Sequence, residues 1–196
     1  MPRLKQVSRT EVTDERILAQ YDKAFGSKDP VAEPGTHGGT PGHWWTVYAL
    51  DPQLFGLMQD RQAWQFSEER LVPPVLRELA ITRAGWVVGS QFVFSQHTKM
   101  LRKLGVDEEM VTSVPHWGSA SCYSDIERAV LAYTDDLVAN TGRTTDELFE
   151  KLKKELSDRA ILELTFMILT YQSSATMARA LRLEFDDRPE QVVEIK

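Results

Sequence analysis

Residues 78–97 read ELAITRAGWVVGSQFVFSQH and predict two consecutive helices. We place the joint at Gly89 and Ser90, because glycine suits the end of one helix and serine suits the N-cap of the next. Glu78 lies on the first predicted helix and His97 on the second. We therefore expect a carboxylate and an imidazole to meet where the two helices pack, and these two residues are the best catalytic candidates in the sequence.

The residues around this stretch support the same interpretation. Pro73 and Pro74 favour a helix start, where the missing N–H of proline is not needed. The second helix should bury His97 among apolar neighbours and end near Gly105. Apolar residues recur at helical spacing along the first helix, at Leu76, Leu79, Ala80, Ala84 and Val87.

An N-terminal helix is predicted from Thr13, its N-cap candidate, and should end at Gly26. A loop rich in glycine and proline follows, residues 26–43, and it contains His37 and His43. Two histidines in a loop raise the question of a metal site. We favour exposed loop histidines and expect no bound metal, because no convincing cluster of further ligands lies nearby.

Three large aromatic residues, Trp44, Trp45 and Tyr48, come directly after this loop. They are candidates for the wall of a substrate pocket. The alternative is that they belong to the core or to a subunit interface, where aromatic clusters are common.

Composition excludes several classes of protein. The net charge of −6 argues against binding to a phosphate backbone, which needs a basic surface. The longest apolar run, residues 164–171, is too short for a membrane-spanning helix, which takes about 20 residues. No apolar core follows residues 1–5, so we expect no secretory signal. The single cysteine, Cys122, excludes a disulfide framework, and we expect a cytoplasmic protein.

The stretch resembles the carboxymuconolactone decarboxylase and alkyl hydroperoxidase (AhpD-like) superfamily, whose peroxidase branch carries a glutamate, a C-x-x-C at a helix N-terminus and a histidine. Alignment on residues 77–81 and His97 places Ser90 and Val93 at the two cysteine positions, so this chain resembles a branch that lacks the pair. Later segments also look like helices of the family: GVDEEMV, ERAVLAYTDDLVANTGRTTDELFEKL and DRAILELTFMILTYQSSATMARAL.

The resemblance implies an all-α, AhpD-like helical domain that assembles into homo-oligomers, trimers or hexamers. We expect an N-terminal helix and arm in residues 1–43, the AhpD-like domain in residues 44–184 and a C-terminal tail in residues 185–196.

The resemblance also implies cofactor-independent decarboxylation of a small acidic lactone or carbonyl compound in the breakdown of aromatic compounds. His97 would donate the proton, and Glu78 would orient it or share in the proton relay. Arg83 is a candidate substrate anchor or a structural ion pair, and Ser90 is a substrate contact or only a helix cap. The alternative for Glu78 is an internal salt bridge, with Arg83 as one candidate partner, and for His97 a satisfied core histidine.

Two other functions stay open. One is a peroxidase-related antioxidant protein, although thiol peroxidase chemistry needs a thiolate and Ser90 supplies none. Cys122 is an alternative reactive thiol, but we favour an inert, small apolar residue, as a lone cysteine usually is. The other is a non-catalytic helical oligomer that binds a small ligand.

Overall fold

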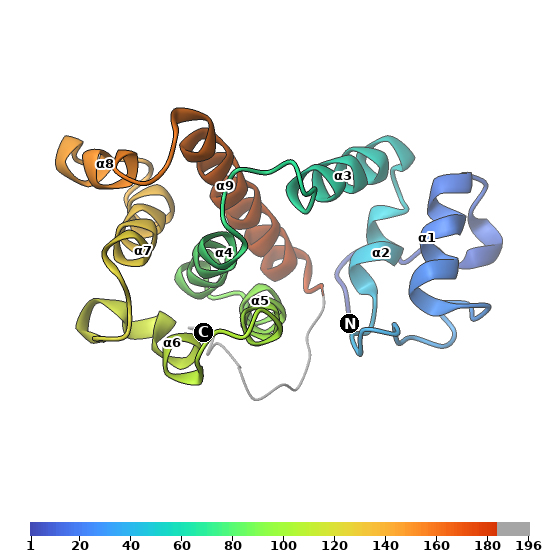
Figure 1. Cartoon of the computed structure of the whole chain (residues 1–196). Coiled ribbons are helices and arrows are strands. Elements are labelled where there is room, and N and C mark those ends of the chain that lie inside the picture. The colour runs from blue at the N-terminus through green and yellow to red at the C-terminus, as the bar shows by residue number, and fades with distance from the viewer. Residues whose placement is uncertain (184–196) are drawn as a thin grey trace. The chain divides into compact units, whose positions relative to one another are not determined.

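A computed structural model describes residues 1–183 (Figure 1), and all regular secondary structure within them is helical, which confirms the predicted all-α class. The predicted tail, residues 185–196, lies outside the described residues. The helices are η1 (Arg9–Glu11), α1 (Glu15–Phe25), α2 (His43–Tyr48), α3 (Pro52–Gln65), α4 (Pro74–Val88), α5 (Gln91–Lys103), α6 (Glu108–Ser113), η2 (Val114–Ser119), α7 (Asp125–Val138), α8 (Asp146–Lys153) and α9 (Asp158–Leu181).

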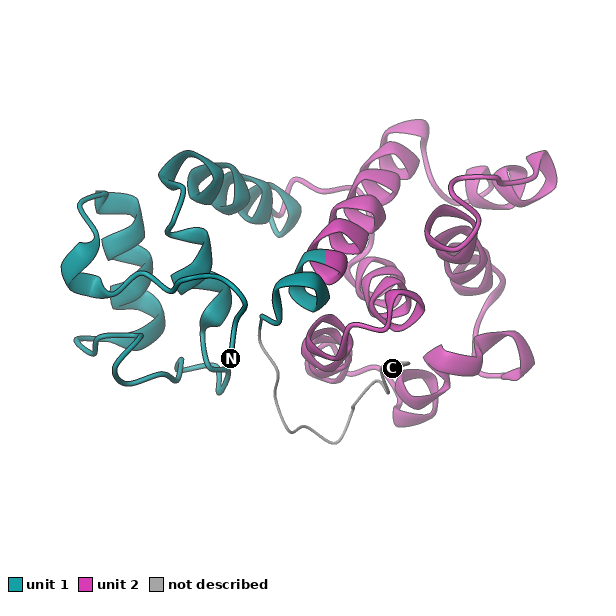
Figure 2. Cartoon of the chain, turned by 180° about the vertical axis from the view of Figure 1, so that it is seen from behind, with its two compact units in different colours: residues 1–67, 177–186 teal, residues 68–176, 187–196 magenta. Residues whose placement is uncertain are grey.

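The chain divides into two compact units (Figure 2). The first comprises residues 1–67 with the described residues 177–183, and the second comprises residues 68–176. The helix α9 begins in the second unit and its last residues belong to the first. The sequence-based division after residue 43 differs from this one, because residues 44–67 cluster with the N-terminal helix.

The first unit contains α1, α2 and α3. The N-cap of α1 is Asp14, one residue later than predicted, because its carboxylate accepts hydrogen bonds from the backbone N–H groups of Arg16 and Ile17 at 2.9 and 3.2 Å. The unit is closed around the fully buried Tyr21, whose hydroxyl donates to the Val7 carbonyl at 2.8 Å.

The second unit is built on α4, which packs against α5 and α7. The joint between α4 and α5 forms as predicted: Gly89 adopts a left-handed conformation, and the Ser90 hydroxyl accepts a hydrogen bond from the Val93 backbone N–H at 3.4 Å. The tight turn brings the two helices into close contact at Gly85, where an added Cβ would lie 2.9 Å from the Phe94 backbone nitrogen. The position of α5 against α4 is therefore set by backbone geometry.

Among the described residues, no helix is long and apolar enough to cross a membrane. On α9, Leu164, Met167 and Ile168 are fully shielded from solvent, whereas Leu162, Phe166 and Leu169 on the same helix are exposed.

Candidate active site

Glu78 and His97 lie together in the second unit. Nδ1 of His97 is 2.6 Å from Oε2 of Glu78, across the contact between α4 and α5. None of the Glu78 side chain is exposed, whereas 8% of the His97 side chain is. A substrate could therefore exchange a proton with His97, while Glu78 acts through it.

A third residue, Arg77, binds the same carboxylate. Its Nε donates to Oε1 of Glu78 at 2.9 Å, so each carboxylate oxygen has a hydrogen-bond partner. The salt bridge considered as the alternative for Glu78 is thus present, but its partner is Arg77 rather than Arg83. Spacing arguments missed Arg77 because adjacent residues do not face each other on a helix.

The electrostatics favour an ionised Glu78. Burial of the carboxyl group would by itself raise its pKa. The hydrogen bonds and charges of His97 and Arg77 oppose this effect and hold the pKa of Glu78 below its ordinary value. An ionised carboxylate only accepts hydrogen bonds, so Nδ1 of His97 must carry the proton that joins the pair. In the neutral imidazole Nε2 is then the basic nitrogen.

Tyr171 of α9 packs edge-on against His97, with ring centroids 4.6 Å apart and an interplanar angle of 85°. It also packs against the buried cluster of Ile81, Val93 and Ala175. The imidazole is thus held on one side by a carboxylate and on another by an aromatic ring. No sequence pattern linked Tyr171 to His97, because the two are 74 residues apart by number, 171 less 97.

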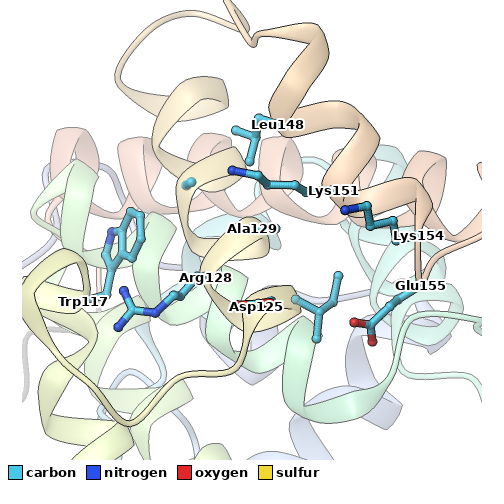
Figure 3. Close-up of a pocket in the computed structure, with 10 residues that line it drawn as sticks. Trp117, Asp125, Arg128, Ala129, Leu148, Lys151, Lys154 and Glu155 are labelled. Atoms are coloured by element: carbon cyan, nitrogen blue, oxygen red, sulfur yellow. The ribbon is translucent and has the colours of Figure 1, made fainter.

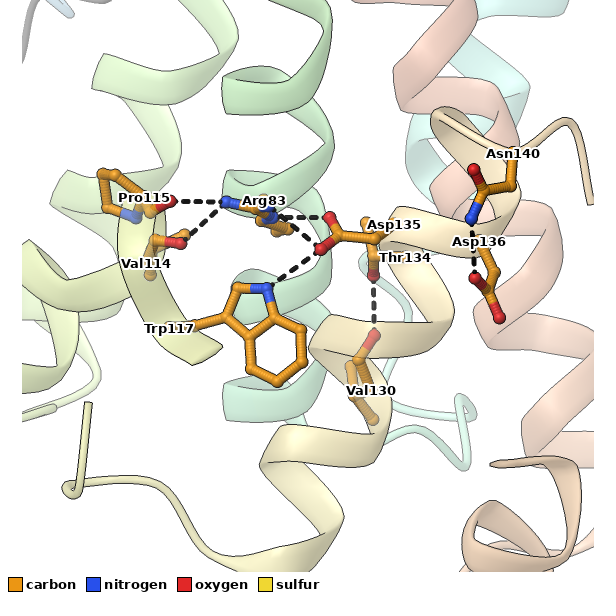
Figure 4. Close-up of polar contacts among 9 residues, drawn as sticks. All are labelled: Arg83, Val114, Pro115, Trp117, Val130, Thr134, Asp135, Asp136 and Asn140. Carbon is orange, nitrogen blue, oxygen red and sulfur yellow. Dashed lines mark hydrogen bonds and ion pairs between the residues drawn. The ribbon is translucent and has the colours of Figure 1, made fainter. Parts of the chain in front are cut away.

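Arg83, which also lies on α4, belongs to a different hydrogen-bond network (Figure 4). Its guanidinium binds both carboxylate oxygens of Asp135 at 2.6 and 3.0 Å, and it donates to the carbonyls of Val114 and Pro115 at 3.1 and 2.9 Å. The indole N–H of Trp117 donates to the same carboxylate at 3.0 Å. The structural ion pair that was one interpretation of Arg83 is therefore present, and its role as a substrate anchor stays a prediction.

Ser90 is almost completely buried, and its hydroxyl caps α5. The structure thus shows Ser90 as a helix cap, which was one of its two interpretations. A contact between the same hydroxyl and a substrate stays a prediction. The single cysteine, Cys122, is half-buried and packs at the edge of the cluster around Leu79 and Tyr123.

The aromatic residues Trp44, Trp45 and Tyr48 belong to the first unit. Trp44 and Tyr48 stack with ring centroids 4.6 Å apart, and Trp45 packs against Phe55. Their contact with a substrate stays a prediction. Within residues 1–183 no three His, Cys, Asp or Glu side chains gather as a metal site would require.

Residues 52–136, which include Glu78 and His97, match the model of the carboxymuconolactone decarboxylase family. This part of the chain is similar to that family. The resemblance drawn from the sequence is confirmed, as is the absence of the cysteine pair, because Cys122 is the one cysteine in the chain. No sequence among curated proteins matches the chain significantly.

Several solved structures share the AhpD-like fold of this chain. A protein of unknown function from Agrobacterium tumefaciens, provisionally assigned as antioxidant defence protein AhpD, is 24% identical, with a TM-score of 0.65 over 72% of this chain and 96% of that one. An uncharacterised peroxidase-related protein from Ralstonia eutropha JMP134 is 15% identical, with a TM-score of 0.69 over 94% and 95%.

A third similar structure is the debrominase Bmp8, in which an alanine replaces a cysteine, in complex with 2,3,4-tribromopyrrole. It is 14% identical, with a TM-score of 0.70 over 94% of this chain and 92% of that one. These similarities concern the fold, because all three proteins are less than 25% identical to this chain.

Proposed function

We propose that this protein is a cofactor-independent enzyme of the carboxymuconolactone decarboxylase type, which uses His97 and Glu78 for acid–base chemistry on a small acidic lactone or carbonyl compound. The observation that carries the proposal is the 2.6 Å contact between His97 Nδ1 and the buried Glu78 carboxylate. We further propose that it works in the cytoplasm, in the breakdown of aromatic compounds, as a trimer or hexamer.

The reaction can be written with the residues present. The substrate carboxylate leaves as carbon dioxide, and the electron pair of the broken C–C bond moves into a conjugated carbonyl, which becomes an enolate. The imidazolium of His97 donates its Nε2 proton to the carbon of this enolate, which restores the carbonyl. The neutral imidazole then recovers a proton from water.

Glu78 contributes through His97. Its carboxylate fixes the orientation of the ring and stabilises the imidazolium that donates the proton. Histidine suits the task because it changes charge between about pH 5 and 8. Together with His97, Arg77 lowers the pKa of the Glu78 carboxyl group and so favours its ionised form inside the protein.

The test is carbon dioxide release from carboxymuconolactone by the wild type and by His97→Ala, Glu78→Gln and His116→Ala. His116 is exposed and provides a matched loss of an imidazole. We expect the wild type and His116→Ala to release carbon dioxide, and a folded His97→Ala to be slower by about 100-fold or more. Release that is unaffected by both active-site substitutions would overturn the acid–base role of the pair.

Two further measurements, hydroperoxide reduction and ligand binding, separate the two alternatives. A peroxidase-related function without the cysteine pair would appear as hydroperoxide reduction that is lost in Cys122→Ser. A non-catalytic binding protein would show no turnover of any acidic lactone or carbonyl compound, with ligand binding that survives Glu78→Gln.

A further inference from the structure

A cavity of about 370 Å³ lies in the second unit, between η2, α7 and α8 (Figure 3). None of its lining residues belongs to the group of Glu78, Arg77, His97 and Tyr171. It is therefore separate from the candidate active site. Its volume is within the range of about 300–1,000 Å³ that is usual for small-molecule sites.

The cavity has an apolar floor. Ile126, Ala129 and Leu148 line it, and the Trp117 indole forms a flat wall. This wall is held in place, because the indole N–H of Trp117 donates to Asp135, which is itself bound by Arg83 (Figure 4). A ligand with a flat apolar body would therefore stack on an aromatic ring that is already held in position.

The charged residues that line the cavity differ in how far they are exposed to solvent. Lys151, Lys154, Asp125 and Glu155 are exposed, so solvent screens them, whereas Arg128 is half-buried. The Arg128 guanidinium donates to the Ala120 carbonyl and, within residues 1–183, has no carboxylate partner. The least screened charge in the cavity is therefore positive and uncompensated.

We infer that this cavity binds a small organic anion with a flat apolar body, of the aromatic carboxylate class. The ring would pack on Trp117 and the apolar floor. The carboxylate would bind Arg128, whose guanidinium suits planar carboxylates. Lys151 and Lys154 would add attraction at the rim.

The probe is benzoate, titrated calorimetrically into the full chain, with benzylamine and benzyl alcohol as ligands of similar size and different charge. We expect saturable benzoate binding, about tenfold weaker or more in Arg128→Gln, because that variant removes the half-buried charge. Ala132→Leu leaves every charge in place and narrows the cavity, so it should weaken binding as well. Lys154→Gln should weaken binding by a smaller factor.

Lys153→Gln is the matched control. Lys153 is adjacent to Lys154 in sequence but does not line the cavity, and it lies near Glu150 and the Phe149 ring. Benzoate binding that is equal in the wild type and Arg128→Gln, or absent altogether, would overturn the inference, as would tighter binding of benzylamine. Loss of binding in His97→Ala with full retention in Arg128→Gln would assign the benzoate to the active site instead, which also overturns it.

Discussion

His97 and Glu78 are joined through Nδ1 and Oε2 at 2.6 Å, and only the histidine has any exposed side-chain surface. One helix thus supplies a buried carboxylate, and the next supplies an imidazole with a small exposed surface. Arg77 binds the opposite oxygen of the same carboxylate. The three residues form a chain of hydrogen bonds centred on the Glu78 carboxylate.

Arg77→Gln should lower the free energy of unfolding by about 3–5 kcal/mol, because it leaves the Glu78 carboxylate buried without its guanidinium partner. Urea unfolding at neutral pH measures the effect. Arg102→Gln removes a partly exposed arginine that pairs with the exposed Glu108, and it should cost less than about 1 kcal/mol. Equal losses in the two variants would contradict the structural role of Arg77.

Gly85→Ala should destabilise the protein by about 1–3 kcal/mol, because the new Cβ would lie 2.9 Å from both the Phe94 nitrogen and Val93 Cγ1. The shift of α5 should also displace His97 and reduce turnover. Gly118→Ala meets no atom within 4 Å and should leave both stability and turnover unchanged. Thermal unfolding and steady-state kinetics of the two variants test this; a Gly85→Ala protein equal to the wild type would refute the close helix contact.

Glu78 should contribute to the acid sensitivity of the protein. Because its pKa is lower in the folded state, its stabilising effect is fully present above the unfolded value of about 4.3. The effect is lost as the pH falls from there through the lower folded pKa. Urea midpoints between about pH 6 and 3 should therefore fall less steeply for Glu78→Gln than for the wild type. Glu147→Gln, which changes an exposed glutamate, should keep the slope of the wild type.

Arg83→Gln and Asp135→Asn distinguish the two interpretations of Arg83. Both break the same half-buried ion pair, so both should lower the free energy of unfolding, by about 1–3 kcal/mol. If Arg83 also anchors the substrate, only Arg83→Gln should raise KM strongly. Equal KM values in the two variants would leave Arg83 as a purely structural residue.

Local signals in the sequence predicted where helices begin and end. Gly89 and Ser90 mark the joint between α4 and α5 through backbone preference and capping, and both act within a few residues. The meeting of Glu78 and His97 followed from their positions on two consecutive helices. The capping box of Ser124 and Glu127 at the start of α7 is a local pattern of the same kind.

Contacts between distant residues could not be predicted by these rules. Asp135 is the partner of Arg83 because α7 packs on α4, and nothing near Arg83 in the sequence signals this. Tyr171 reaches His97 from α9 for the same reason. The cavity at Arg128 depends on how α7, α8 and η2 pack, which periodicity alone does not specify.

The most direct test of the pair is the protonation of the His97 ring, measured by nitrogen NMR on protein labelled at histidine, with His97→Ala used to assign the signal. At a pH where the imidazole is neutral, we predict a proton on Nδ1, held by Glu78, and a bare Nε2. In Glu78→Gln this preference should weaken. A neutral ring with its proton on Nε2 in the wild type would contradict the account, because Nδ1 would then have no proton to donate to the Glu78 carboxylate.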